Sequence, residues 1–185
     1  GYYMMPDKTK EEFTADGWFK TGDIGQFADD GSLQIVDRKK NLIKLKGGEY
    51  IAIENMEMCY NNSVFVDAKN GGCCCYGDGD MDRPIAVIQL NLATVKSWMK
   101  ENGITDSIEK VTESKALYDA VLADMVKEHK NAGLARNEKL VAIGFVTDPW
   151  TPENGCLTAA NKLQRRAVKE KHEAQFDELI KKGIF

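Results

Sequence analysis

Acidic, basic and glycine residues gather in three short segments where a packing argument gives them no role. In the first segment, Gly22 and Asp23 stand at the start of an extended run that continues to Phe27. A carboxylate at an exposed strand start can accept two hydrogen bonds, and a cis-diol such as a ribose offers two donors at a matching separation. Asp23 is therefore a candidate ribose ligand. The plainer interpretation is an aspartate that belongs to a turn.

The second segment, residues 36–50, is basic in an otherwise acidic chain. Five Lys or Arg residues lie within nine consecutive positions that begin at Arg38. An arginine can grip phosphate or ribose oxygens with its planar fork, whereas a lysine such as Lys40 acts as a point charge. Gly47 and Gly48 then let the backbone approach a ligand closely. The alternative is a solvated charged strand that ends in a hairpin turn.

The third segment, residues 153–166, is a polar, glycine-containing loop that leads into an expected helix. Lys162 stands at the expected start of that helix, where the helix dipole disfavours a positive charge. Local violations of this kind are typical of functional residues. The alternative interpretation is a solvated loop lysine.

Taken together and in this order, the three segments resemble the fatty acyl-CoA synthetases of the adenylate-forming (AMP-binding) superfamily. The first two segments match the signature of that family at Asp16-Gly17-Trp18, Thr21 through Gly25, Phe27, Gly31, Leu33, Ile35, Asp37 through Leu42, Lys44-Leu45 and Gly47 through Ile51. The third is similar to the family's terminal lysine motif at Asn154-Gly155, Leu157-Thr158 and Lys162. The resemblance covers nearly the whole chain, although residues 64–84 fit no pattern of the family.

The resemblance implies an α+β fold and two parts. Residues 1–37 would be the last segment of the N-terminal adenylation domain, with a β-hairpin that ends at a hinge. Residues 38–185 would be the C-terminal lid, a small mixed sheet with packed helices. The chain does not start with Met, so we expect it to be a piece of a longer protein whose own N-terminal adenylation domain is its partner.

The resemblance also assigns a role to each candidate residue. The nucleotide would be bound by Asp23, Arg38 and Lys40, and Asp37 would be the hinge. Lys162 would be the catalytic lysine of the adenylation step. Gly47 and Gly48 would line the channel for the pantetheine arm of CoA in the second step.

The implied activity is that of an ATP-dependent long-chain fatty acid–CoA ligase. Its substrates would be a fatty acid, Mg-ATP and CoA, with no bound metal or prosthetic group in this chain, which alone should be inactive. Two alternatives stay open. One is another adenylate-forming ligase, acting on a short or aromatic acid or loading a carrier protein. The other is a non-catalytic interaction module that kept the lid fold.

Alternation, helical periodicity and turn residues predict the elements that must position these side chains. A hairpin is expected over residues 23–37. Further strands are expected over 41–46, 64–68, 73–76, 85–90 and 140–147, and helices over 53–60, 94–102, 114–132 and 164–182. The acidic loop at 77–82 is expected to be flexible and lacks the spacing of a calcium loop.

Composition narrows the function classes further. The chain of 185 residues is 43% hydrophobic with a net charge of −4, which argues against a dedicated nucleic-acid binder. Five cysteines without a metal-ligand spacing indicate reduced thiols. We therefore expect an intracellular, reducing compartment, either the cytoplasm or the surface of an organelle membrane. Peripheral membrane association is expected only for the full-length protein. His129 and His172 are expected to be solvated surface residues.

Overall fold

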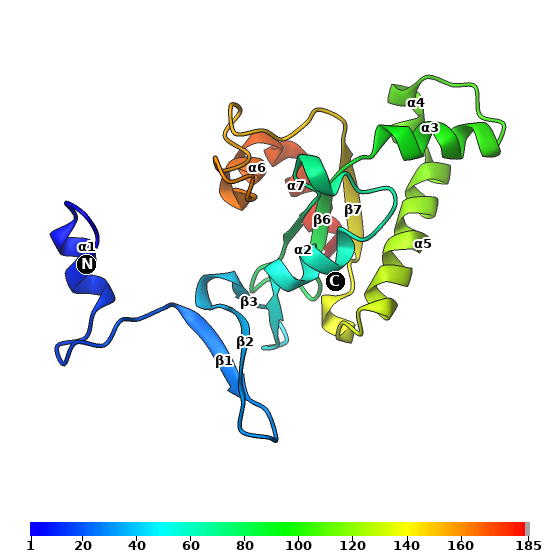
Figure 1. Ribbon diagram of the computed structural model, residues 1–185. Helices are drawn as coiled ribbons and strands as arrows, with labels where there is room; N and C mark the ends of the chain where they lie inside the picture. The colour runs from blue at the N-terminus through cyan, green and yellow to red at the C-terminus, as the bar shows by residue number, and fades with distance from the viewer. Residues whose placement is uncertain (184–185) are drawn as a thin grey trace. The chain divides into compact units, whose positions relative to one another are not determined.

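The computed structural model describes residues 1–183. The chain forms two compact units, Gly1–Leu42 and Ile43–Phe185 (Figure 1). The first unit contains α1 (Pro6–Glu12), followed by strands β1 (Asp23–Phe27) and β2 (Leu33–Arg38). β1 and β2 pair antiparallel, which confirms the predicted hairpin. The turn between them has Gly31 at φ 82°, a conformation that favours glycine.

The second unit contains two small sheets. β3 (Leu42–Lys44) and β4 (Tyr50–Ala52) form one of them. The other has the strand order β5 (Cys73–Tyr76), β6 (Ile85–Gln89), β7 (Ala142–Val146), in which β5 and β6 pair antiparallel and β6 and β7 pair parallel. The long segment between β6 and β7 contains the helices that a parallel connection requires.

Helices cover both faces of the three-stranded sheet. One face is covered by α2 (Ile53–Tyr60), α3 (Leu92–Glu101) and α5 (Lys115–Asn131), with the short α4 (Ile108–Thr112) beside them. The other face is covered by α6 (Arg165–Lys171) and α7 (Glu173–Gly183). Asn91, Ser107 and Ser114 cap the starts of α3, α4 and α5 with their side chains. This architecture confirms the predicted α+β class.

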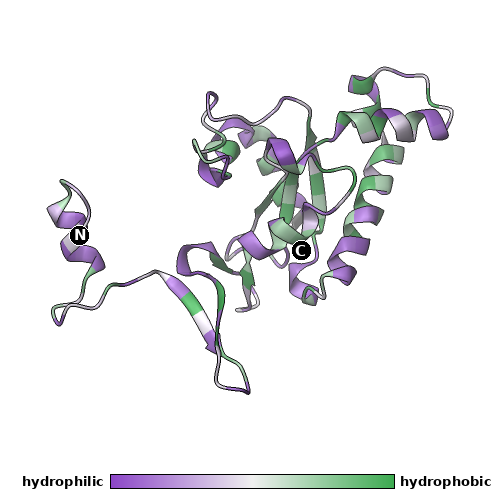
Figure 2. Cartoon of the chain, viewed as in Figure 1, coloured by the Kyte–Doolittle hydropathy of each residue, from purple (hydrophilic) through white to green (hydrophobic). Residues whose placement is uncertain are grey.

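Strand alternation explains why the sheet has two buried faces. Cys73 and Cys75 belong to the core under α2 and α5, whereas Cys74 belongs to the core under α6 and α7. On β6, Ala86 and Ile88 alternate with Ile85 and Val87 in the same way. A strand with both faces covered is mostly apolar, which Figure 2 shows as largely green strands at the centre of this unit.

Two of the expected elements are wrong. Residues 64–68 form no strand: a single bridge joins Val66 to Leu90, and the carboxylate of Asp124 instead accepts a hydrogen bond from the Val64 N–H. The helix expected over 164–182 is broken at His172, whose φ of −116° and ψ of 30° end α6. The His172 carbonyl then accepts the first hydrogen bonds of α7.

The histidines and the acidic loop also differ from expectation. His172 is half-buried and its Nε2 accepts a hydrogen bond from the fully buried Trp150 indole at 3.0 Å. His129 is half-buried as well, with Nε2 3.0 Å from the Ala135 carbonyl. The loop at 77–82 is anchored rather than free, because Met81 is fully buried and its carbonyl accepts a hydrogen bond from the Lys46 N–H at 3.0 Å.

Candidate functional site

Asp23 and Arg38 face each other across the hairpin of the first unit. They are paired in the strand register, and Arg38 Nε lies 3.8 Å from Asp23 Oδ1. The side chain of Arg38 is 58% exposed and that of Asp23 is 32% exposed, so their attraction is screened and adds little to stability. An exposed carboxylate beside an exposed guanidinium can instead bind the hydroxyls and phosphate of a nucleotide.

Asp37 is buried and organises the turn that follows the hairpin. Its Oδ1 accepts hydrogen bonds from the Arg38 N–H at 2.6 Å and from Asn41 Nδ2 at 2.9 Å. Its Oδ2 is buried without a partner among residues 1–183. The turn is a 3₁₀ helix, Lys39–Asn41, that presents Lys40 to solvent. The division between the compact units falls after Leu42, and the hinge at Asp37 with its domain boundary stays a prediction.

Gly47 and Gly48 form the tip of the turn between β3 and β4. The Leu45 N–H donates to the Glu49 carbonyl at 2.8 Å, and the Gly48 N–H donates to the Leu45 carbonyl at 2.9 Å. Gly48 has φ +91°, so any side chain there is strained, although the space around it is open. A Cβ at Gly47 would meet only the flexible carboxylate of Glu49. The exposed backbone at this tip is suited to close contact with a narrow ligand.

Lys162 lies at the tip of a loop that is held together by its own hydrogen bonds. The Thr158 N–H donates to the Lys162 carbonyl at 2.8 Å, and the Lys162 N–H donates to Thr158 Oγ1 at 3.1 Å. The side chain is exposed and has no ion pair or hydrogen bond with any described residue. α6 begins at Arg165 with Gln164 as its N-cap, one residue from the expected start at 164, and Lys162 lies in the loop just before it.

The chain also contains an ion pair between a buried glutamate and a half-buried arginine, which the sequence did not reveal. Glu57 on α2 accepts hydrogen bonds on both carboxylate oxygens from Arg165, 2.9 and 3.1 Å from Nε, and its Oε2 lies 2.5 Å from an Nη. Burial raises the pKa of Glu57 to about 7, although Arg165 opposes the shift. Burial alone would lower the pKa of Arg165, but the hydrogen bonds to Glu57 outweigh it and the pKa is raised.

A signal for Glu57 was present in the sequence. Ile53, Met56, Glu57 and Tyr60 have the spacing of one helix face, and all four are buried. A carboxylate on such a face requires a cation, but the spacing does not reveal that the cation is Arg165, 108 residues away.

The predicted site residues fall in both units. Asp23, Asp37, Arg38 and Lys40 belong to the first unit, and Gly47, Gly48 and Lys162 belong to the second. Within the second unit, no hydrogen bond or ion pair between described residues joins Lys162 to the two glycines.

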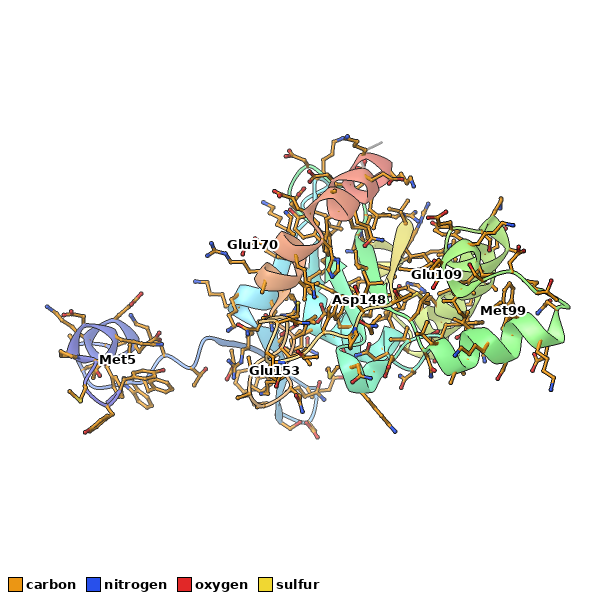
Figure 3. All side chains as sticks on the ribbon, turned by 90° about the horizontal axis from the view of Figure 1, so that it is seen from above. Met5, Met99, Glu109, Asp148, Glu153 and Glu170 are labelled. Atoms are coloured by element: carbon orange, nitrogen blue, oxygen red, sulfur yellow. The ribbon has the colours of Figure 1, made fainter. Side chains whose placement is uncertain are left out.

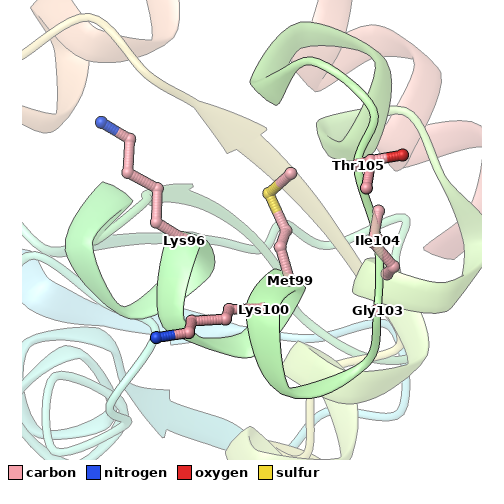
Figure 4. A pocket seen from close by; sticks show the side chains of 6 residues that line it. All are labelled: Lys96, Met99, Lys100, Gly103, Ile104 and Thr105. Atoms are coloured by element: carbon pink, nitrogen blue, oxygen red, sulfur yellow. The ribbon is translucent and has the colours of Figure 1, made fainter.

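A shallow hollow of about 350 Å³ lies at the end of α3 and includes none of these residues. Its lining is Lys96, Met99, Lys100, Gly103, Ile104 and Thr105 (Figure 4). Through residue 183, the chain has no cluster of His, Cys, Asp or Glu that could hold a metal ion. Over the same residues, none of the helices has the length and apolar character that crossing a membrane requires.

Comparison with solved structures defines the class. The adenylation domain of a carboxylate reductase from Mycobacterium chelonae is similar with a TM-score of 0.81 and 27% identity, over 97% of this chain and 26% of that one. No protein-family model matches the chain. The fold is that of the C-terminal part of an adenylate-forming enzyme.

Sequence relatives define the family within that class. Long-chain-fatty-acid–CoA ligase 1 of Saccharomyces cerevisiae is 40% identical over 95% of this chain, and the ligase 1 of Schizosaccharomyces pombe is 37% identical over 96%. The chain spans about a quarter of the length of these relatives. The chain is therefore homologous to the long-chain fatty acid–CoA ligases over about a quarter of their length.

Proposed function

We propose that this chain is the hinge and lid of an ATP-dependent long-chain fatty acid–CoA ligase. In the first step, the fatty acid carboxylate attacks the α-phosphorus of ATP, which gives acyl-AMP and releases pyrophosphate. In the second step, the CoA thiol loses its proton and attacks the acyl-AMP carbonyl, which gives acyl-CoA and releases AMP. The 40% identity to a ligase of this specificity, over 95% of the chain, is the observation that carries the proposal.

Lys162 serves the first step. That step brings two anions together, and a cation held between them lowers the barrier by stabilising the charge of the transition state. The ammonium group of Lys162 is a compact charge on a long arm, and it points to solvent without a partner among the described residues. It is therefore free to contact the carboxylate and phosphate oxygens when the lid closes.

Gly47 and Gly48 serve the second step. The pantetheine arm of CoA is thin and must pass between protein surfaces to reach the acyl-AMP. A turn without side chains, open around Gly48, can line such a passage without filling it. Rotation about Asp37 exchanges the lysine loop for the glycine turn, so that one lid serves two half-reactions.

The remaining residues bind the nucleotide. Asp23 accepts hydrogen bonds from the ribose, Arg38 contacts ribose and phosphate, and Lys40 reaches the phosphates from its exposed turn. Residues 1–37 belong with the preceding adenylation domain, and residues 38–185 form the lid. Mg²⁺ enters with ATP as part of the substrate and neutralises its phosphates. For the whole protein we propose a reducing compartment, in the cytoplasm or against an organelle membrane.

The test is product formation by the full-length enzyme. Incubated with palmitate, ATP and CoA, it should form palmitoyl-CoA, AMP and pyrophosphate in equal amounts, and Lys162→Ala should abolish most of this turnover. A panel of acetate, benzoate and a carrier protein distinguishes the rivals. Preference for any of these over palmitate would assign the chain to another branch of the adenylate-forming enzymes.

A further inference from the structure

An ion pair between a buried glutamate and a half-buried arginine joins the helix that follows the glycine turn to the helix that follows the lysine loop. Glu57 lies on α2, directly after β4, and Arg165 is the first residue of α6. The Glu57 side chain is 7% exposed, and its Oε1 also accepts a hydrogen bond from the Cys75 N–H at 3.1 Å. The carboxylate therefore fixes three elements, α2, β5 and α6, at one point in the core.

The loop that carries Lys162 is a self-contained turn that ends at this ion pair. The Gln164 side-chain amide donates to the carbonyls of Gly155 and Leu157, both at 3.0 Å, and Leu157 also bridges to Leu163. These contacts join the start of the loop to its end. Arg165, the next residue after Gln164, attaches the loop to α2 through a bidentate contact.

The Lys162 side chain makes no contact that could fix its own position, so its backbone must do so. Misplacement of a reacting charge by about 1 Å can cost a hundredfold in rate. We propose that Glu57 and Arg165 are positioning residues that hold the Lys162 loop for the adenylation half-reaction. The proposal rests on the role given to Lys162 above and adds two residues that do not themselves touch the substrates.

The charges around Glu57 give the proposal a pH signature. Arg165 faces the carboxylate from α6, the thiols of Cys73, Cys74 and Cys75 on β5 are close enough to interact with its charge, and Glu54 lies near it on its own helix. Arg165 stays protonated, and burial raises the pKa of the Glu57 carboxyl to about 7. As the pH falls through 7, the ion pair loses its negative partner and the loop loses its attachment. Adenylation should therefore decline on the acid side of pH 7.

The experiment measures the two half-reactions separately in the full-length enzyme. Fatty-acid-dependent pyrophosphate release reports adenylation, and acyl-CoA formation from pre-made palmitoyl-AMP reports the second step. The variants are Glu57→Gln, Lys162→Ala and the two combined. The matched control is Glu170→Gln, which removes the partner of the neighbouring Arg166 in a solvent-exposed pair on the same helix; Glu170 is labelled in Figure 3. If Glu57→Gln unfolds at the assay temperature, Arg165→Lys tests the positioning role in its place.

Glu57→Gln should lower adenylation at pH 8 at least tenfold, remove the decline below pH 7, and change the second step less than twofold. In the Lys162→Ala background it should have no further effect, because it acts only through that lysine. Glu170→Gln should behave as wild type. The positioning role is wrong if Lys162→Ala lowers adenylation but Glu57→Gln does not. It is also wrong if Glu57→Gln lowers both steps equally. If Lys162→Ala itself leaves adenylation intact, the proposed function of the lysine fails instead.

Discussion

Burial of Glu57 should make the stability of this chain depend on pH in an unusual direction. The folded pKa is about 7 and the ordinary value is 4.5, so between these values the folded chain holds a proton that the unfolded chain has lost. Folding is therefore favoured at the lower pH, and stability falls as the pH rises through this window. One pKa unit corresponds to about 1.4 kcal/mol, which gives a loss of about 2–3 kcal/mol between pH 5 and pH 8.

The measurement is urea unfolding of the chain at several pH values for wild type and Glu57→Gln. The glutamine keeps the shape but cannot titrate, so the difference in free energy of unfolding between the two proteins isolates the contribution of Glu57. This difference should shift by about 2–3 kcal/mol in favour of the variant from pH 5 to pH 8. Glu170→Gln, at an exposed position, should show no such shift. A constant difference for Glu57→Gln across this range would refute the reasoning.

Three further predictions follow from the site and its surroundings. Burial and the neighbouring Lys171 lower the pKa of His172. The stability that the neutral imidazole contributes should therefore be lost as the pH falls below about 6.5. His172→Gln should remove this pH dependence in the same unfolding experiment. Gly48→Ala should destabilise the turn by about 1–2 kcal/mol because of its positive φ, whereas Gly47→Ala should be nearly neutral; equal costs would contradict the geometry. The chain alone should form no acyl-CoA from palmitate, ATP and CoA, and turnover by it would show that these 185 residues hold a complete active site.

Sequence patterns predicted most of the helices and strands because the spacing of apolar residues depends on neighbouring residues in the chain. The apolar stripe of Leu117, Val121 and Met125 predicted α5, and all three residues are buried. The mostly apolar run from Ile85 to Leu90 predicted a strand, and β6 spans Ile85–Gln89. In each case the information lies within a few residues of the element that it specifies.

The misses depend on contacts between distant residues. α6 and α7 separate at His172, whose imidazole bonds to Trp150, 22 residues earlier, and no local breaker marks the position. Phe65 and Val66 are β-formers that are buried in a turn segment instead of a strand. The Glu57–Arg165 pair spans 108 residues. The motif residues could be identified because a resemblance connected them, but the groups that hold those residues in place could not.

The two surfaces of the lid must fail separately if one lid serves two half-reactions. In the full-length enzyme, Lys162→Ala should lower acyl-AMP formation by about a hundredfold or more, the usual effect of one preorganised electrostatic group, and leave acyl-CoA formation from pre-made acyl-AMP nearly unchanged. Gly47→Leu should do the reverse, because a branched side chain obstructs the passage of pantetheine while the turn tolerates a Cβ at this position. Equal loss of both half-reactions in each variant would contradict the alternation of the lysine loop and the glycine turn.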